Sequence, residues 1–241
     1  MRKQLTSCYR DSISDFREKI LAYVENVLKY VQHRISATVE GVAIPSEILC
    51  RYCDGQVVEY LIREFLVSKL DEYTIRHDGK KDYRVRRTGH SVSETSYDCI
   101  SDIHNDIRAL VNVKVCKSGG ANNAVAAIQQ LYKDYVETEP KVKKCFLVLK
   151  VHYGFCHSIR NASQGERAIS IEKVEAFFLD EVDLSKEHLQ DHRSWSDKSK
   201  NPNAGRLQVS DAFLASHIVP APNISYENTV KMLKAVVKRN G

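Results

Sequence analysis

The segment from Ile107 to Cys116 alternates almost perfectly between two kinds of side chain. Successive side chains of a β-strand point to opposite faces of the sheet. One face of this strand would therefore be wholly apolar, formed by Ile107, Ala109, Val111, Val113 and Val115. The other face would carry an amide, Asn112, and an ammonium, Lys114, two residues apart. The alternation predicts a half-buried strand with chemically useful groups on its polar face.

The patterns on either side of this strand predict a mixed α/β domain. Apolar residues recur at helical spacing over 10–35, 55–70 and the final segment 225–239. The other expected elements are a loop or hairpin over 75–90, strands near 96–103, 143–153 and 169–182, a helix over 123–136 and a short strand within 205–213. No repeat or linker divides the chain, so we expect a single domain over 1–241.

The charge of the chain is modest in total but unevenly distributed. The 241 residues carry a formal net charge of +5, and much of the excess lies in basic loops. The segment 76–87 contains six Lys or Arg residues against Asp78 and Asp82. Basic loops on a nearly neutral body suit a polyanion such as nucleic acid.

The same composition indicates where the protein works. No apolar run approaches the roughly 20 residues that span a membrane, and the N-terminal residues lack the apolar core of a signal peptide. The seven cysteines show no disulfide framework. We therefore expect a cytoplasmic protein with reduced thiols and no membrane partner.

Three polar residues of the expected strand pair would form a site. If the strands near 96–103 and 107–116 make a hairpin, Asp98 lies near the start of one strand, and Asn112 and Lys114 lie near the middle of the other. Two oxygen ligands suit a hard cation such as Mg²⁺. A lysine beside them can orient a water and offset negative charge that develops on a phosphate.

Asp98, a gap and Asn112-Val113-Lys114 resemble the motif of the PD-(D/E)XK nuclease superfamily, which includes most type II restriction endonucleases. The resemblance implies a restriction-endonuclease-like core, with a mixed central β-sheet flanked by helices. It also implies Mg²⁺-dependent hydrolysis of phosphodiester bonds in double-stranded DNA at a short symmetric sequence. Asp98, Asn112 and Lys114 would be catalytic. Glu59, from the preceding helix, would join Asp98 and Asn112 as a metal ligand.

The sequence departs from the family pattern at two positions. Tyr97 stands where the motif has proline, and Asn112 stands where it has an acid. A neutral amide oxygen should bind a cation more weakly than a carboxylate. Asn112 could be a native ligand, an engineered Asp→Asn change or the mark of a nuclease that has lost activity. Asp98 is preferred as the first acid, with Asp102 as the alternative.

The resemblance further implies a homodimer, because cutting both strands at a symmetric site needs two catalytic centres. Residues 1–70 would supply N-terminal helices and dimerisation, with the helix over 10–35 as the dimer surface; 95–180 would be the catalytic core, and 181–241 a DNA-contacting loop and C-terminal helix. Residues expected to contact DNA lie in three segments: Arg86, Arg87, Ser91, Lys117, Asn122, Asn123, Ser196, Lys198, Lys200, Asn201 and Asn203.

Two other readings remain open. The chain could be a DNA-binding protein that keeps the nuclease fold without cutting, or an α/β protein unrelated to nucleic acids. A structural zinc would require Cys50 and Cys53, in CxxC spacing, to meet a looser group that contains Cys145 and His152. We do not favour zinc, because Cys145 lies in the most apolar expected strand.

Overall fold

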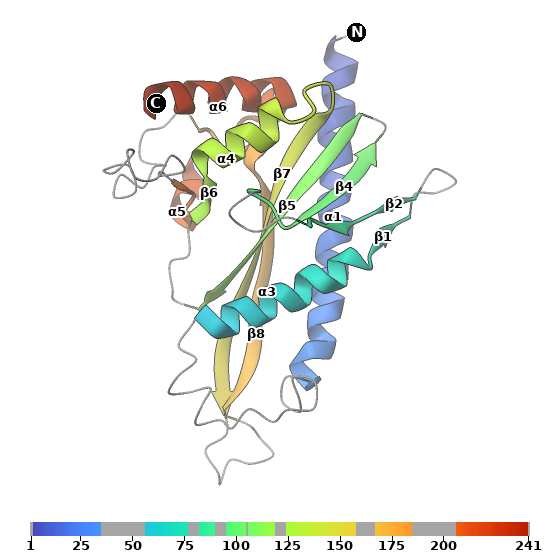
Figure 1. Cartoon of the computed structure of the whole chain (residues 1–241), viewed down its shortest axis with the longest axis vertical. Helices are drawn as coiled ribbons and strands as arrows, with labels where there is room; N and C mark the ends of the chain where they lie inside the picture. The colour runs from blue at the N-terminus through green and yellow to red at the C-terminus, as the bar shows by residue number, and fades with distance from the viewer. Residues whose placement is uncertain are drawn as a thin grey trace.

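The computed structural model describes residues 2–34, 56–76, 82–89, 95–104, 106–118, 124–157, 167–184 and 206–240. A five-stranded sheet forms its centre, in the order β3-β4-β5-β7-β8 (Figure 1). Its strands are β3 (Arg86–Arg87), β4 (Cys99–His104), β5 (Ile107–Lys117), β7 (Lys143–His157) and β8 (Arg167–Phe178). The expected mixed α/β architecture with a central mixed sheet and flanking helices is confirmed.

The sheet is mixed because one connection crosses over. β3 pairs antiparallel with β4, and β4 pairs antiparallel with β5, where Cys99 lies opposite Val111. The chain then passes through a helical segment before β7, which runs parallel to β5 along its whole length, with Ile107 beside Lys143. β8 returns antiparallel to β7. β5 therefore lies in the middle of the sheet, with a neighbour on either side.

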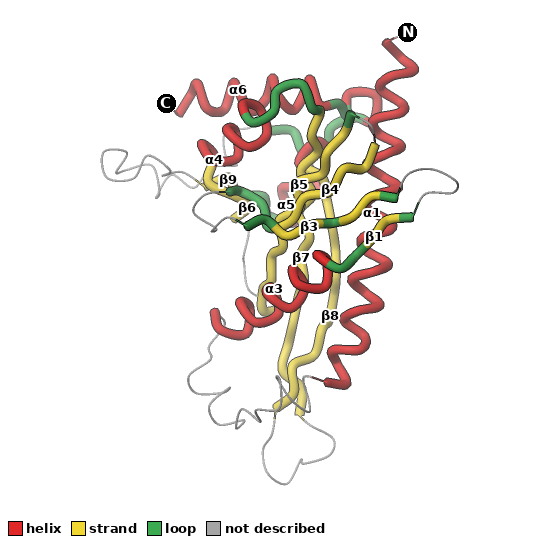
Figure 2. Tube along the Cα trace, turned by 45° about the vertical axis from the view of Figure 1, so that its right-hand side comes forward, coloured by secondary structure: helices red, strands yellow, loops and turns green. Residues whose placement is uncertain are grey.

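Helices cover both faces of the sheet and enclose two cores. α1 (Arg2–Arg34) and α3 (Gln56–Asp71) pack on the face that carries the alternate apolar residues of β5. The opposite face is covered by α4 (Ile128–Tyr132), a π-helical turn η1 (Lys133–Glu137), α5 (Asp211–Ser216) and α6 (Tyr226–Asn240). Figure 2 shows α1 running alongside the sheet for much of its length. The apolar face of residues 107–116 is thus confirmed as a core face.

The polar face of β5 is more deeply buried than its sequence indicates. Leu110 packs in the second core, and Asn112 is only 7% exposed. β7 is buried on both faces from Lys144 to Val151, as expected for its apolar run. Two lysines, Lys144 and Lys150, are included in that buried stretch. Each must therefore have partners inside the protein.

Two segments differ from the elements expected for them. Residues 124–127 form a short strand, β6 (Ala124–Ala127), and the helix begins only at Ile128. β6 pairs with β9 (Arg206–Gln208), so tertiary pairing overrides the helix propensity of its alanines. Of residues 206–213, only those of β9 form a strand. Ser210 then caps α5 by accepting a hydrogen bond from the Phe213 N–H (3.1 Å).

The remaining short elements connect the larger ones. β1 (Thr74–Ile75) pairs with β2 (Tyr83–Arg84), so the basic segment 75–90 begins as a hairpin, whose expected tip at Asp78-Gly79 lies outside the described residues. Single 3₁₀ turns follow β8 and precede α6: η3 (Leu179–Glu181) and η6 (Ala221–Asn223).

The apolar stripe of α1 is used within the chain. Tyr23 stacks on Tyr73, with ring centroids 4.0 Å apart, and its hydroxyl donates a hydrogen bond to the carbonyl of Lys69 (2.7 Å). Val27 packs against the first core, and the side chain of Val31 is outside the described part. Both Tyr23 and Val27 are half-buried against their own chain, and the expectation that this stripe forms a dimer surface stays a prediction.

Candidate catalytic and metal-binding site

Asp98 lies at the point where the chain enters β4. Its N–H donates to the carbonyl of Val111 (2.8 Å), which fixes its backbone beside β5. Its carboxylate oxygen Oδ2 accepts a hydrogen bond from the N–H of Val113 (2.7 Å). That N–H belongs to the peptide group that joins Asn112 to Val113. The structure therefore brings the Asp98 carboxylate to the segment that carries Asn112 and Lys114.

The side-chain amide of Asn112 is held through its nitrogen. Its Nδ2 donates to the carbonyl of Ser96 (2.6 Å), and the Ser96 N–H and hydroxyl both donate to Asp134 (2.6 and 2.7 Å). The carbonyl oxygen of the same amide, Oδ1, is buried and receives no hydrogen bond from the described residues. A buried acceptor without a donor costs about 1–3 kcal/mol, so this oxygen marks a place where a ligand would be favourable.

Lys114 lies on the same face of β5 as Asn112 and is half-buried. Its neighbour in the parallel β5–β7 pair is Lys150. The Lys150 side chain is 5% exposed and donates to Asp211 Oδ1 (2.7 Å), at the first turn of α5. The hydrogen bond from Lys150 lowers the pKa of Asp211, so this carboxylate stays charged opposite the ammonium.

Arg63 of α3 is the cation that faces Asp98. Its guanidinium donates to Asp98 Oδ1 and also lies 3.4 Å from Glu64 Oε1. Burial acts to lower the pKa of Arg63, but the hydrogen bond and charge of Asp98 raise it, and the net shift is upward. Both carboxylate oxygens of Asp98 are thus occupied, one by Arg63 and one by the Val113 N–H. Sequence reasoning missed Arg63, although it lies one helical turn after Glu59.

Glu59 does not join Asp98, which corrects its expected role as a metal ligand. Its carboxylate takes a backbone hydrogen bond from Lys117, and burial raises its pKa. Lys117 lies four residues beyond Val113 along β5, which is about 13 Å at roughly 3.3 Å per residue. The physical reason is the direction of α3 relative to β5. Its N-terminal turn reaches the far end of the strand, and only the next turn, with Arg63, reaches Asp98.

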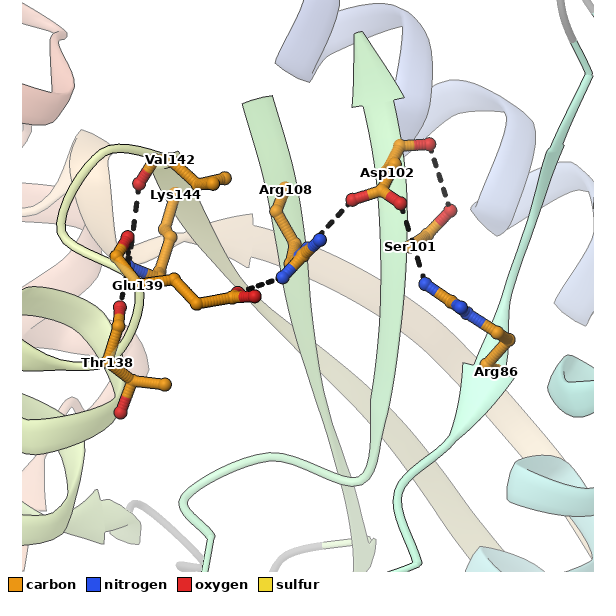
Figure 3. Close-up of polar contacts among 8 residues, drawn as sticks. All are labelled: Arg86, Ser101, Asp102, Arg108, Thr138, Glu139, Val142 and Lys144. Atoms are coloured by element: carbon orange, nitrogen blue, oxygen red, sulfur yellow. Dashed lines mark hydrogen bonds and ion pairs between the residues drawn. The ribbon is translucent and has the colours of Figure 1, made fainter. Parts of the chain in front are cut away.

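Asp102, the alternative first acid, belongs to a different cluster (Figure 3). It lies opposite Arg108 in the β4–β5 pair and accepts a hydrogen bond from its Nε (2.7 Å). Arg86 approaches the same carboxylate at 3.5 Å, and Arg108 also pairs with Glu139. Arg108 is four residues from Asn112 along β5. The geometry therefore favours Asp98 as the acid that accompanies Asn112 and Lys114.

Three of the residues expected to contact DNA are described. Arg86 and Arg87 are neighbours on β3 with side chains 54% and 48% exposed, and Lys117 is exposed at the end of β5. Arg87 also pairs with Glu64 at 2.6 Å. The other eight residues of that set lie outside the described residues: Ser91, Asn122, Asn123, Ser196, Lys198, Lys200, Asn201 and Asn203.

The residues of the zinc alternative do not form a described site. Cys145 is fully buried in β7, and burial raises the pKa of its thiol well above the ordinary value. His152 lies 3.3 Å from the sulfur of Cys116 and 2.8 Å from Glu175 instead. Cys50 and Cys53 lie outside the described residues. Within the described ranges, no three His, Cys, Asp or Glu side chains are grouped to hold a metal ion.

Asp98 and Asn112 nevertheless offer the ligand type that Mg²⁺ prefers. They supply one carboxylate and one amide oxygen, and Mg²⁺ commonly takes one or two protein oxygens together with waters and phosphate oxygens. The unpartnered Asn112 Oδ1 is the observation that fits such an ion. The opposing observation is the guanidinium of Arg63, which occupies Asp98 Oδ1. The donor set therefore fits the ion in a state where Arg63 has left this oxygen.

No protein-family model matches the chain, and no curated protein matches its sequence. In the part of the chain that the structure describes, every helix is too short or too polar to cross a membrane. The candidate site therefore rests on its own geometry.

Proposed function

We propose that this chain is a Mg²⁺-dependent endonuclease that hydrolyses phosphodiester bonds of double-stranded DNA. The observation that carries the proposal is the hydrogen bond from Val113 to Asp98, which joins the acid to the Asn112-Val113-Lys114 segment. The element order supports it: a helix, antiparallel strands, a helical crossover and a parallel strand are what the resemblance to PD-(D/E)XK nucleases implies. By the same resemblance, the enzyme would be a type II restriction endonuclease of a restriction-modification system.

Each residue has a distinct task in this proposal. Asp98 and Asn112 would hold a Mg²⁺ ion, and the chemistry that such an ion supplies is to polarise a phosphate and lower the pKa of a bound water. Lys114 follows on the same strand face and would offset the negative charge that develops on the phosphate. Ser96 and Asp134 hold the Asn112 amide so that its oxygen, not its nitrogen, faces the cation.

The DNA would contact basic side chains on β3 and at the end of β5. Arg86, Arg87 and Lys117 are exposed and suit phosphate oxygens. Two protomers would be needed to cut both strands at a symmetric sequence. The working form would therefore be a homodimer on double-stranded DNA, in the cytoplasm.

Incubation of the chain with plasmid DNA tests the proposal directly. We expect discrete fragments with Mg²⁺ and none with a chelator. Asp98→Asn should abolish cutting, and Asp102→Asn is the matched control because Asp102 is paired with Arg108. Cutting that survives Asp98→Asn, or that needs no divalent ion, would remove the proposal.

One observation favours a second function. Asn112 adds no charge to the site, and Arg63 already neutralises Asp98. Such a site would suit a protein that binds DNA and does not cut it. Retardation of a DNA fragment in a gel, without cleavage at any Mg²⁺ or Mn²⁺ concentration, would support this alternative.

A further inference from the structure

A continuous series of ion pairs runs from the protein surface to Asp98. Arg87, exposed on β3, donates to Glu64 Oε2 (2.6 Å). The other oxygen of Glu64 lies 3.4 Å from Arg63, and Arg63 donates to Asp98. Exposure falls along the series, from 48% for the Arg87 side chain to 8% for Asp98. The series joins a residue expected to bind DNA to the candidate metal ligand.

Each carboxylate in the series holds the arginine beside it in place through the attraction of opposite charges. Glu64 is shared between two guanidinium groups and lies closer to Arg87 than to Arg63. Arg63 is therefore held mainly by Asp98. If Arg87 moved to another anion, the whole charge of Glu64 would be available to Arg63, which would then be drawn away from Asp98.

We propose that binding of a DNA phosphate by Arg87 releases Arg63 from Asp98 and so opens Asp98 to a divalent cation. Glu64 is the element that transmits the change, because it can neutralise either arginine. The unpartnered oxygen of Asn112, 7% exposed and one residue from the Val113 N–H that binds Asp98, supplies the second ligand. This inference rests on the proposed function and adds to it an order of events, with DNA before metal.

Coupling of this kind is reciprocal and has a measurable size. If DNA raises the affinity for the cation, the cation raises the affinity for DNA by the same factor. Couplings between sites are on the order of five- to 150-fold. For this series of four charges we expect DNA to tighten cation binding about tenfold.

The chain contains a matched control for the first residue of the series. Arg86 is adjacent to Arg87 on the same strand and its side chain is 54% exposed against 48% for Arg87, but it pairs with Asp102 (3.5 Å) and not with Glu64. Loss of either arginine removes one positive charge from the same DNA-facing strand. Only loss of Arg87 should change the site at Asp98.

The test measures Mn²⁺ binding by electron paramagnetic resonance of the free ion, with the full chain alone and with a mixed-sequence DNA duplex. Mn²⁺ bound by the duplex alone is subtracted. The wild-type chain should bind Mn²⁺ about tenfold more tightly with the duplex than without it. Arg63→Met should already bind Mn²⁺ about tenfold more tightly than the wild type without DNA. The duplex should tighten this binding little further.

Three further variants keep the test decisive if Arg63→Met folds poorly. Arg87→Met should resemble the DNA-bound state and bind Mn²⁺ about tenfold more tightly without DNA, whereas Arg86→Met should match the wild type. Glu64→Gln should bind Mn²⁺ no more tightly than the wild type and should lose the effect of the duplex. Far-ultraviolet circular dichroism confirms that each variant is folded.

The outcomes separate this inference from the proposed function. If the chain cuts DNA but Arg63→Met binds Mn²⁺ no more tightly than the wild type, the ion-pair series has no such role and the nuclease proposal stands. Identical behaviour of Arg87→Met and Arg86→Met would also overturn the inference. Absence of both cutting and Mn²⁺ binding in a folded Arg63→Met chain would remove the inference together with the proposed function.

Discussion

Lys150 and Lys114 are neighbours across the parallel β5–β7 pair, and Lys150 is neutralised by Asp211 at 2.7 Å. Two unneutralised ammonium groups on adjacent strands would repel one another in a half-buried position. The Asp211 carboxylate offsets the charge of Lys150 and so reduces its repulsion of Lys114. The same contact holds α5 against the sheet.

Replacement of Lys114 by alanine should abolish DNA cutting and largely spare DNA binding. Lys114 is expected to act on charge that develops during the reaction, so its loss should lower the rate by about 10²–10³-fold, as for removal of other transition-state donors. Lys117→Ala, three residues further along β5, is the comparison. It should weaken binding and leave the rate at saturating DNA nearly unchanged. A Lys114→Ala chain that cuts at the wild-type rate would place the catalytic site elsewhere.

Replacement of Asn112 by aspartate should tighten cation binding and lower the stability of the metal-free chain. A carboxylate is a stronger Mg²⁺ ligand than an amide, but it cannot donate to the Ser96 carbonyl as Asn112 does (2.6 Å). Loss of this donor should lower the free energy of unfolding of the metal-free chain by about 1–3 kcal/mol. Thermal melting with and without Mg²⁺ measures both effects, and the stability should return as Mg²⁺ is added.

The cutting activity of the same variant distinguishes the origins of Asn112. If Asn112 is a native ligand, Asn112→Asp should keep activity or change its metal preference. If it is an engineered block, the change should restore cutting to an inert protein. An Asn112→Asp chain that is stable, binds Mg²⁺ no more tightly than the wild type and cuts no DNA would support the alternative of a DNA-binding protein that does not cut.

The sequence predicts the sheet more reliably than the site. The alternation over 107–116 and the apolar run at 143–153 correspond to β5 and β7, because strand patterns reflect burial directly. The helices expected over 10–35, 55–70 and 225–239 correspond to α1 (Arg2–Arg34), α3 (Gln56–Asp71) and α6 (Tyr226–Asn240). β6 was not predictable, since its four residues pair with a strand about 80 positions later.

The site depends on the relative placement of elements, which local patterns do not contain. Helical spacing allows Glu59 and Arg63 to lie on neighbouring parts of one face of α3. Only the packing of α3 on β5 decides that Arg63 reaches Asp98 and Glu59 reaches Lys117. The pairing of Arg87 with Glu64 likewise joins two segments that no sequence motif connects.

Replacement of Asp180 by alanine should strongly destabilise the chain. Asp180 is 1% exposed and accepts hydrogen bonds from Tyr9 (2.8 Å), Tyr135 (2.6 Å) and Thr229 (2.9 Å). These residues come from α1, η1 and α6, so one carboxyl group joins three helical elements over β7. Loss of this hydrogen-bond acceptor, together with the small cavity that alanine leaves, should lower the free energy of unfolding by about 2–4 kcal/mol. Urea denaturation measures the change.

The control for this stability change is Asp11→Ala. The side chain of Asp11 is 69% exposed on α1, and its pair with Arg10 is long, at 3.6 Å. Exposed ion pairs of this kind contribute little to stability. The free energy of unfolding of Asp11→Ala should therefore stay within about 0.5 kcal/mol of the wild-type value. Equal effects of the two substitutions would mean that the buried carboxyl group does not hold the helices together.

The pair of Lys150 and Asp211 should make stability depend on pH in the acid range. The hydrogen bond from Lys150 lowers the pKa of Asp211 below its usual value of 3.8. A lowered pKa in the folded state means that the contribution is present above pH 3.8 and is lost as the pH falls through the folded value. Wild-type melting temperature should therefore drop below pH 4 more steeply than that of Asp211→Asn. Lys150→Met should show the same shallower profile, and parallel profiles for all three chains would contradict the assignment.

The chain should bind DNA as a homodimer, with two protomers on one short duplex. Each chain has one candidate centre at Asp98, and a symmetric cut in two strands needs two centres related by the two-fold axis of the duplex. Tyr23, in the α1 stripe expected at the dimer surface, also stacks on Tyr73 of its own chain. We therefore expect the second protomer to be held largely through the DNA, and its recruitment to weaken as salt rises, because Arg86 and Arg87 bind phosphate with release of counterions. Sedimentation of the chain alone, and with duplex at low and moderate salt, measures both stoichiometry and salt dependence. A single protomer per duplex under all conditions, or an affinity that hardly changes with salt, would contradict this arrangement.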